Sequence, residues 1–124
     1  MRYTLLLHYP EMTADELGAE TLEAGQRAFQ AYATALHDAG VLIGAEVLQP
    51  SSATTTVSAA SGRLQVQDGP YAATKEQLGG TFVIDVPDLD AALAWAEQAP
   101  SVQWGAVEVR PTATHTVDGQ WVEG

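Results

Sequence analysis

The segment from Val66 to Gly80 concentrates the side chains that could carry out chemistry in this chain. It holds an aspartate, a tyrosine, a lysine, a glutamate and a glutamine among turn-forming glycine and proline residues. A dense polar loop between two apolar strands is where a small domain commonly places a site. Asp68 is the candidate general acid or base, provided that burial or a like charge moves its pKa toward neutrality. Its alternative role is structural, as the hydrogen-bond acceptor of the turn at Gly69-Pro70.

His8 is the candidate partner of Asp68 in proton transfer. It is the one of the three histidines that falls on a predicted core strand, and imidazole exchanges protons near neutral pH. Its alternative role is that of a strand-end histidine bonded to the backbone. His37 and His115 are expected on the surface. Lys75 could bind an anionic substrate group, although a solvated surface lysine is the simpler expectation.

Several kinds of site do not fit the sequence. The absence of cysteine excludes thiolate nucleophiles, disulfides and cysteine-based metal centres. His8, Glu46 and Asp85 match no metal-ligand spacing, so no metal is predicted. Gly79-Gly80 lacks the strand and helix that flank a phosphate-binding loop, and instead predicts a bulge or a close backbone approach. No cofactor is predicted.

Composition limits the partners. The chain has 124 residues, of which 46% are apolar and 17% charged, and this predicts a single domain with a sizeable core. The net charge of −11 would repel nucleic acid and anionic membranes. No apolar run approaches the ~20 residues of a membrane span, and no signal peptide is evident. A cytoplasmic location is expected.

The elements that must position these residues follow from hydrophobic periodicity and from turn residues. Strands are predicted at residues 3–9, 41–48, 53–59, 63–67, 81–86 and 106–109, with a turn at Ser61-Gly62. A capping box at residues 13–16 begins a long helix that ends at Gly40, and Asp88 caps a second helix that stops before Pro100. The apolar stripe of the first helix comprises Leu22, Phe29, Tyr32, Ala33 and Leu36, and that of the second Leu89, Ala92, Leu93 and Ala96.

The resulting order, β-α-β-β-α-β with an added hairpin, predicts an α+β, ferredoxin-like fold in which both helices cover one face of an antiparallel sheet. Residues 112–124 form a C-terminal extension, in which residues 117–121 suggest a small hairpin. Trp121 in this hairpin is expected to pack against a neighbouring surface.

Alternation along the strands divides the predicted sheet into two faces. The face expected to meet the helices is apolar, with Tyr3, Leu5, Leu7, Val41, Ile43, Ala45, Val47, Phe82, Ile84, Val86, Val107 and Val109. The other face is half polar and holds His8, Glu46, Asp85, Glu108 and Arg110. A second copy of the chain could cover this face and form a two-subunit barrel with a polar cleft. Alternatively these charged residues sit at strand ends or pair with each other, Arg110 with Glu46 or Glu108.

The run from Asp68 to Gly80, Asp-Gly-Pro-Tyr-Ala-Ala-Thr-Lys-Glu-Gln-Leu-Gly-Gly, resembles the signature of the DGPF branch of the YCII-related proteins. The resemblance continues through residues 82–86, 90–96 and 105–111. It implies a ferredoxin-like subunit, a dimeric α/β barrel, and a His–Asp pair in a cleft. Asp68 matches the signature aspartate, Tyr71 stands at the position of the name-giving phenylalanine, and His8 is a positional candidate for the histidine.

Two functions are therefore open. The first is an acid–base enzyme, a lyase or isomerase acting on a small organic molecule, with Asp68 and His8 handling protons. Tyr71, Glu46, Asp85 and Arg110 would then shape the pocket. The second is a non-catalytic module that binds a small molecule or regulates through protein partners, since relatives are often labelled as transcription-initiation proteins.

Overall fold

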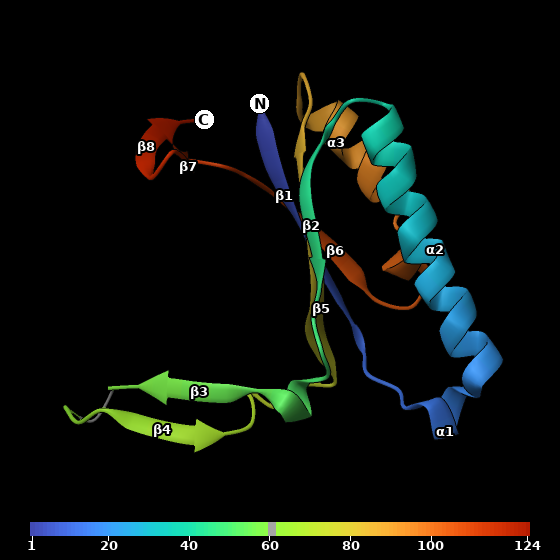
Figure 1. The fold of residues 1–124 in the computed structure, drawn as a ribbon, viewed down its shortest axis with the longest axis vertical. Helices are drawn as coiled ribbons and strands as arrows, with labels where there is room; N and C mark the ends of the chain where they lie inside the picture. The colour runs from blue at the N-terminus through green and yellow to red at the C-terminus, as the bar shows by residue number, and fades with distance from the viewer. Residues whose placement is uncertain (60–61) are drawn as a thin grey trace.

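The fold is a four-stranded antiparallel sheet with helices packed on one of its faces (Figure 1). The computed structural model describes residues 1–59 and 62–124. The sheet consists of β1 (Arg2–Pro10), β2 (Leu42–Val47), β5 (Glu76–Asp85) and β6 (Ala106–Pro111). The helices are α1 (Ala14–Leu17), α2 (Ala19–Asp38) and α3 (Leu89–Ala96), with 3₁₀ turns η1 (Ser51–Ala53) and η2 (Pro100–Gln103). Two separate hairpins complete the chain, β3 (Thr55–Ser58) with β4 (Gln65–Asp68) and β7 (Thr114–Val117) with β8 (Gln120–Glu123).

The strand order confirms the predicted α+β class. The strands lie in the order β2-β5-β1-β6, and every neighbouring pair is antiparallel. Helices α2 and α3 both lie on the same side of this sheet (Figure 1). This order is compatible with the predicted ferredoxin-like arrangement, and it leaves the second face of the sheet without a covering layer from the described part of the chain.

The core lies between the sheet and α2, where the apolar faces of both are buried. β1 contributes Tyr3, Leu5 and Leu7, β5 contributes Phe82 and Ile84, and α2 contributes Tyr32 and Leu36. The Tyr32 and Phe82 rings meet edge to face with centroids 5.1 Å apart. The Tyr32 hydroxyl donates a hydrogen bond of 2.6 Å to the Trp95 carbonyl, and burial raises the pKa of Tyr32 to about 12.

The predicted helix ends are confirmed with one change. Thr13 and Glu16 form the capping box, because the Glu16 amide donates to the Thr13 hydroxyl at 3.2 Å and Glu16 accepts in return from the Thr13 amide. Gly18, at φ 85°, separates α1 from α2, so the predicted single helix is two. Gly40 has φ 74° after α2, and the Asp88 carboxylate caps α3 by accepting from the Ala91 amide at 2.9 Å.

Three predictions of burial are wrong: that of Ile43, that of Val47, which is 60% exposed at the end of β2, and that of Leu89 and Leu93. The ladder between β2 and β5 shifts at Ile43, so that Leu42 lies opposite the buried Ile84 and Ile43 is 47% exposed. A bulge of this kind inserts one unpaired residue, which moves Leu42 instead of Ile43 to the core side. Leu89 and Leu93 are also exposed, because α3 turns its small residues, Ala92 and Ala96, toward the core.

Strand β5 begins five positions earlier than the predicted strand at 81–86 and includes both glycines of the Gly79-Gly80 pair. Along β1, Leu7 pairs with Gly80 but His8 pairs with Leu78, so Gly79 is a bulge. A Cβ at Gly79 would lie 2.1 Å from Cζ of Tyr9, whose ring also packs against Phe29 and Trp104. The predicted bulge is therefore confirmed, and the group that approaches Gly79 closely is the side chain of Tyr9. Burial, and then the Glu11 carboxylate, raises the pKa of Tyr9.

The two hairpins project from the sheet as arms, on the side away from the helices (Figure 1). The β3–β4 arm leaves one end of the sheet and the β7–β8 arm leaves the other. The Glu11 carboxylate, which follows β1, accepts from the Ser51 amide at 2.5 Å and so holds the base of the β3–β4 arm. The predicted hairpin at 117–121 is confirmed, with Asp118 and Gly119 both at positive φ in its turn. Of the predicted turn at Ser61-Gly62, Ser61 lies outside the described residues.

Candidate functional site

The open face of the sheet carries its polar residues in rows that run across the strands. The ladder places Glu46, Thr81, Leu6 and Glu108 in one row, in the order β2, β5, β1, β6. The rows on either side of it contain Leu78, His8 and Ala106, and Gly44, Val83, Thr4 and Arg110. Residues of adjacent rows on one face are diagonal neighbours, within reach of long side chains. The predicted half-polar face therefore exists.

His8 and Glu108 make the closest polar contact on this face. Nε2 of His8 lies 2.6 Å from Oε1 of Glu108, and the two side chains are 31% and 54% exposed. A carboxylate accepts a hydrogen bond, so this contact assigns the proton to Nε2 of the imidazole. Nδ1 of a neutral His8 then keeps its lone pair and can accept a proton from a bound molecule. The arrangement is that of a base oriented by a carboxylate.

Sequence reasoning missed the role of Glu108, which was considered only as a partner for Arg110. The alternative in which Arg110 pairs with Glu46 or Glu108 is not found within the described part of the chain, where Arg110 makes no ion pair. The pair of His8 and Glu108 could have been inferred from the predicted fold. In a ferredoxin-like order the last strand lies beside the first, which brings the outward side chains of residues 106–109 next to His8.

Asp68 and Tyr71 lie at the foot of the β3–β4 arm. Asp68 pairs with Thr55 in the arm ladder, and its side chain is exposed without a hydrogen bond or ion pair to any residue in 1–59 or 62–124. The expected turn contact of its carboxylate is therefore not formed there. Instead the Thr56 hydroxyl donates to the Gly69 carbonyl at 2.7 Å, and the Gly69 amide donates to the Thr54 carbonyl.

A cavity of about 430 Å³ lies between the foot of this arm and β5. Its lining comes from two segments, Leu48, Gln49, Pro50, Ser51, Ala53, Thr54 and Thr56, and then Pro70, Tyr71, Gln77 and Leu78. Leu78 is also the direct neighbour of His8 across β1 and β5. The cavity therefore adjoins the row that contains His8, and the residues after Asp68 form one of its walls.

The other predicted site residues lie farther from His8. Asp85 is opposite Arg2 at the far end of β1, and its carboxylate accepts from the Met1 amino group at 3.1 Å. Arg110 is opposite Thr4, four positions along β1 from His8. Glu46 shares the row of Glu108 but is separated from it by β5 and β1. Of the six predicted site residues, only His8 and Tyr71 are linked by the structure. Leu78 pairs with His8 in the ladder, and Leu78 and Tyr71 both line the cavity.

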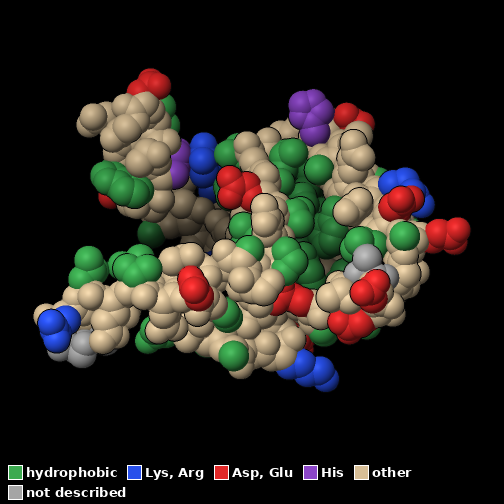
Figure 2. All heavy atoms as spheres, turned by 60° about the horizontal axis from the view of Figure 1, so that its bottom comes forward, with side chains coloured by type: hydrophobic (Ala, Val, Ile, Leu, Met, Phe, Trp, Pro, Cys, Tyr) green, Lys and Arg blue, Asp and Glu red, His purple; other side chains and the backbone are tan. Residues whose placement is uncertain are grey.

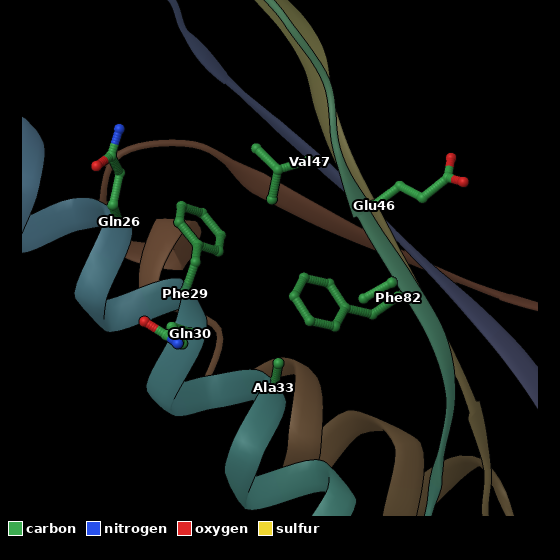
Figure 3. Close-up of a pocket in the computed structure, with 8 residues that line it drawn as sticks. Gln26, Phe29, Gln30, Ala33, Glu46, Val47 and Phe82 are labelled. Carbon is green, nitrogen blue, oxygen red and sulfur yellow. The ribbon is translucent and has the colours of Figure 1, made fainter.

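A second hollow, of about 330 Å³, lies on the helix side of the sheet between α2 and β2. Phe29, Ala33, Val47 and Phe82 line it, while the carboxylate of Glu46 points away from it (Figure 3). This view shows the alternation of β2 directly, because Val47 points to the helix and Glu46 to the open face. The hollow is apolar and holds no candidate for proton transfer among the described residues.

The described residues contain no group of three or more histidine, cysteine, aspartate or glutamate side chains arranged to hold a metal ion. The helices among them do not combine the length and apolar character that a membrane span requires. The chemistry that the arrangement can support is proton transfer and hydrogen bonding at His8, next to a cavity of small-molecule size.

The sequence model of the YCII-related domain matches residues 1–114 of this chain. The chain belongs to the YCII-related family. It is also similar to an uncharacterized protein of Rhizobium meliloti (strain 1021), with 34% identity over 117 residues that cover 93% of this chain and 94% of the relative. The resemblance drawn from the segment at 68–80 is thus confirmed at the level of the YCII-related family. The match extends from β1 into β7 and so includes His8, Glu108 and the whole β3–β4 arm.

Proposed function

We propose that this YCII-related protein is an acid–base enzyme, of lyase or isomerase type, that acts on a small organic molecule at the open face of its sheet. The contact that carries the proposal is the one between His8 Nε2 and Glu108 Oε1, at 2.6 Å. Glu108 orients the imidazole, and Nδ1 takes a proton from the substrate and returns it at another position. Tyr71 contacts the substrate from the adjoining cavity.

The proposed reaction takes place in the cleft of a homodimer. A face that holds both Leu6 and Val83 and the His8–Glu108 pair is too apolar for a plain solvent surface and too polar for a core. A second copy packed on it would give the dimeric ferredoxin-like barrel, exclude water from the imidazole, and bring Glu46, Asp85 and Arg110 into the walls of the cleft. The location that this proposal assumes is the cytoplasm.

An alternative function is that of a non-catalytic module that binds a small molecule and acts through protein partners. The observation that favours it is the lining of the 430 Å³ cavity, to which the described residues contribute no carboxylate and no histidine. A pocket of this volume, lined by apolar groups and amide or hydroxyl groups, is suited to binding without chemistry.

The two functions are separated by combining ligand binding with the protonation state of His8. A thermal-shift screen of small carboxylic acids and phenols is expected to find stabilising ligands. Nitrogen-15 spectra should then show the Nε2–H form of neutral His8, and the His8→Ala and Glu108→Ala variants should bind those ligands less tightly. Ligands that bind both variants as tightly as the wild type would support the binding module. An Nδ1–H form of His8 in the free protein would remove the basis for the acid–base enzyme.

A further inference from the structure

The β3–β4 arm is amphipathic, although no described part of its own chain forms a core beneath it. Val57 pairs with Val66 in its ladder, and Leu64 follows the alternation of Val66, so the three side chains share one face, with Thr55 and Asp68 at its foot. They are 61%, 66% and 75% exposed. The opposite face is polar, with Thr56, Ser58, Gln65 and Gln67. A two-stranded hairpin is at best marginally stable alone, so an apolar face on it indicates a surface that it packs against.

The β7–β8 arm exposes one large aromatic side chain at the other end of the sheet. Trp121 is 73% exposed and shares its face of the hairpin with Thr116 and Glu123, as the ladder places them. Figure 2 shows hydrophobic side chains on both arms and a hollow between them. The arms are well separated within one chain (Figure 1), so they cannot cover each other's apolar side chains.

We propose that the β3–β4 arm of one copy packs against the β7–β8 arm of a second copy, with Val57, Leu64 and Val66 on Trp121 and Arg63 beside Glu123. This rests on the dimer of the proposed function and specifies which surfaces hold it together. In a two-fold dimer each such contact occurs twice, so that both ends of the cleft are closed.

Charge selects this pairing over its alternatives. Arg63 lies near the tip of the β3–β4 arm and Asp68 at its foot, while the β7–β8 arm carries the carboxylates of Asp118 and Glu123, so the attraction acts at the tip of the first arm. Packing two β7–β8 arms together would bring these carboxylates against one another, and packing two β3–β4 arms would oppose the arginines. Like charges that face each other across an interface oppose association, whereas the mixed pairing sets a guanidinium against carboxylates.

The length of the arm also fits. Two sheets packed face to face lie about 10 Å apart, and the four residues of β3 extend roughly 13 Å at the usual rise of a strand. An arm that leaves one sheet toward the open side is therefore long enough to reach past the sheet of the second copy. Its base is tied to the end of β1 by the contact of Glu11 with Ser51.

The proposal is tested by sedimentation of the wild type, Arg63→Glu, Glu123→Arg and the double variant over a range of concentrations. Each single reversal is expected to weaken the dimer by roughly tenfold or more, and the double variant to recover most of that loss. Arg27→Glu is the matched control, because Arg27 lies on α2 near Glu23, away from both arms, and should leave the dimer affinity unchanged.

Trp121 gives an independent readout. Its fluorescence emission is expected to shift to shorter wavelength as the dimer forms, and the concentration-dependent part of that shift should disappear in Trp121→Phe. A dimer that neither reversal weakens would overturn the arm contact and leave the proposed cleft standing. A wild type that stays monomeric at high concentration would overturn the arm contact and the dimer together. The acid–base role of His8 is tested separately, by the protonation of its imidazole.

Discussion

Gly105 lies directly against the backbone of His8. A Cβ at residue 105 would come within 2.0 Å of the His8 carbonyl oxygen and 2.9 Å of the Cα of Tyr9. Since backbone atoms cannot turn aside as a flexible side chain can, β1 and the segment before β6 fit together only if residue 105 has no side chain. The position that anchors the proposed site is thus coupled to the packing of the last strand of the sheet.

We expect Gly105→Ala to destabilise the fold by about 2 kcal/mol or more, because the strand that carries Glu108 must move away from β1. The measurement is the free energy of unfolding in urea. Gly25→Ala is the matched control: residue 25 is helical, and a Cβ there would meet no neighbouring atom within 4 Å, so alanine should stabilise α2 by about 0.5–1 kcal/mol. Equal effects of the two substitutions would contradict the clash at residue 105.

Stability should fall at alkaline pH partly because of Tyr32. Burial raises the pKa of Tyr32 to about 12, whereas the unfolded chain ionises its tyrosines near 10. The unfolded state therefore loses this proton first, and the contribution of Tyr32 is complete below pH ~10 and declines as pH rises toward 12. Tyr32→Phe should lose about 1 kcal/mol at neutral pH, with its hydrogen bond to Trp95, but should show a shallower decline above pH ~10. If the stabilities of the wild type and Tyr32→Phe decline in parallel above pH ~10, the ionisation of Tyr32 is not the cause of the decline.

Asp88 should contribute measurably to the stability of α3. Its carboxylate accepts from the Ala91 amide at 2.9 Å, so Asp88→Ala is expected to cost about 1 kcal/mol. Asp90→Ala is the comparison, since it removes the same charge from the first turn without removing the cap. Thermal unfolding of both variants would separate the hydrogen bond from the helix dipole, and an equal loss in both would assign the effect to charge alone.

Ser101 is fully buried, and its hydroxyl has no hydrogen-bond partner among the residues that the structure describes. Removing an unpaired buried hydroxyl relieves its desolvation cost. Ser101→Ala should therefore leave the free energy of unfolding unchanged or raise it by up to about 1 kcal/mol. Ser101→Val tests the packing around the same position, where added volume should destabilise. A loss of stability in Ser101→Ala would show that the hydroxyl is satisfied in solution.

Sequence patterns predicted the core of the fold because they rest on local physics. Alternation in β1 identified Tyr3, Leu5 and Leu7 as buried, and capping chemistry located the helix ends at Thr13, Gly40 and Asp88. The errors came where one residue interrupts a pattern. Gly18 divides the first helix, and the bulge at Ile43 exchanges the two faces at the start of β2.

The candidate site was less accessible from sequence, because it depends on which strands lie side by side. His8 was found from its strand position, but its partner Glu108 is one hundred residues away and became visible only through the pairing of β1 with β6. The direction of the two arms could not be predicted either. Turn residues mark a hairpin, but they do not say whether it folds back onto the sheet or projects from it.

Because of the bulge at Gly79, the number of residues in the segment around it matters to the site as much as the identity of those residues. In unbroken alternation Leu78 would share the side of Gly80 and Phe82, which faces the helices. The extra residue reverses that phase, so that Leu78 and the loop before it lie with His8. Deleting one glycine would restore regular pairing while turning the wall of the cavity to the opposite side of the sheet. A protein could thus keep nearly every residue of this segment and lose its site through a change of one position in spacing.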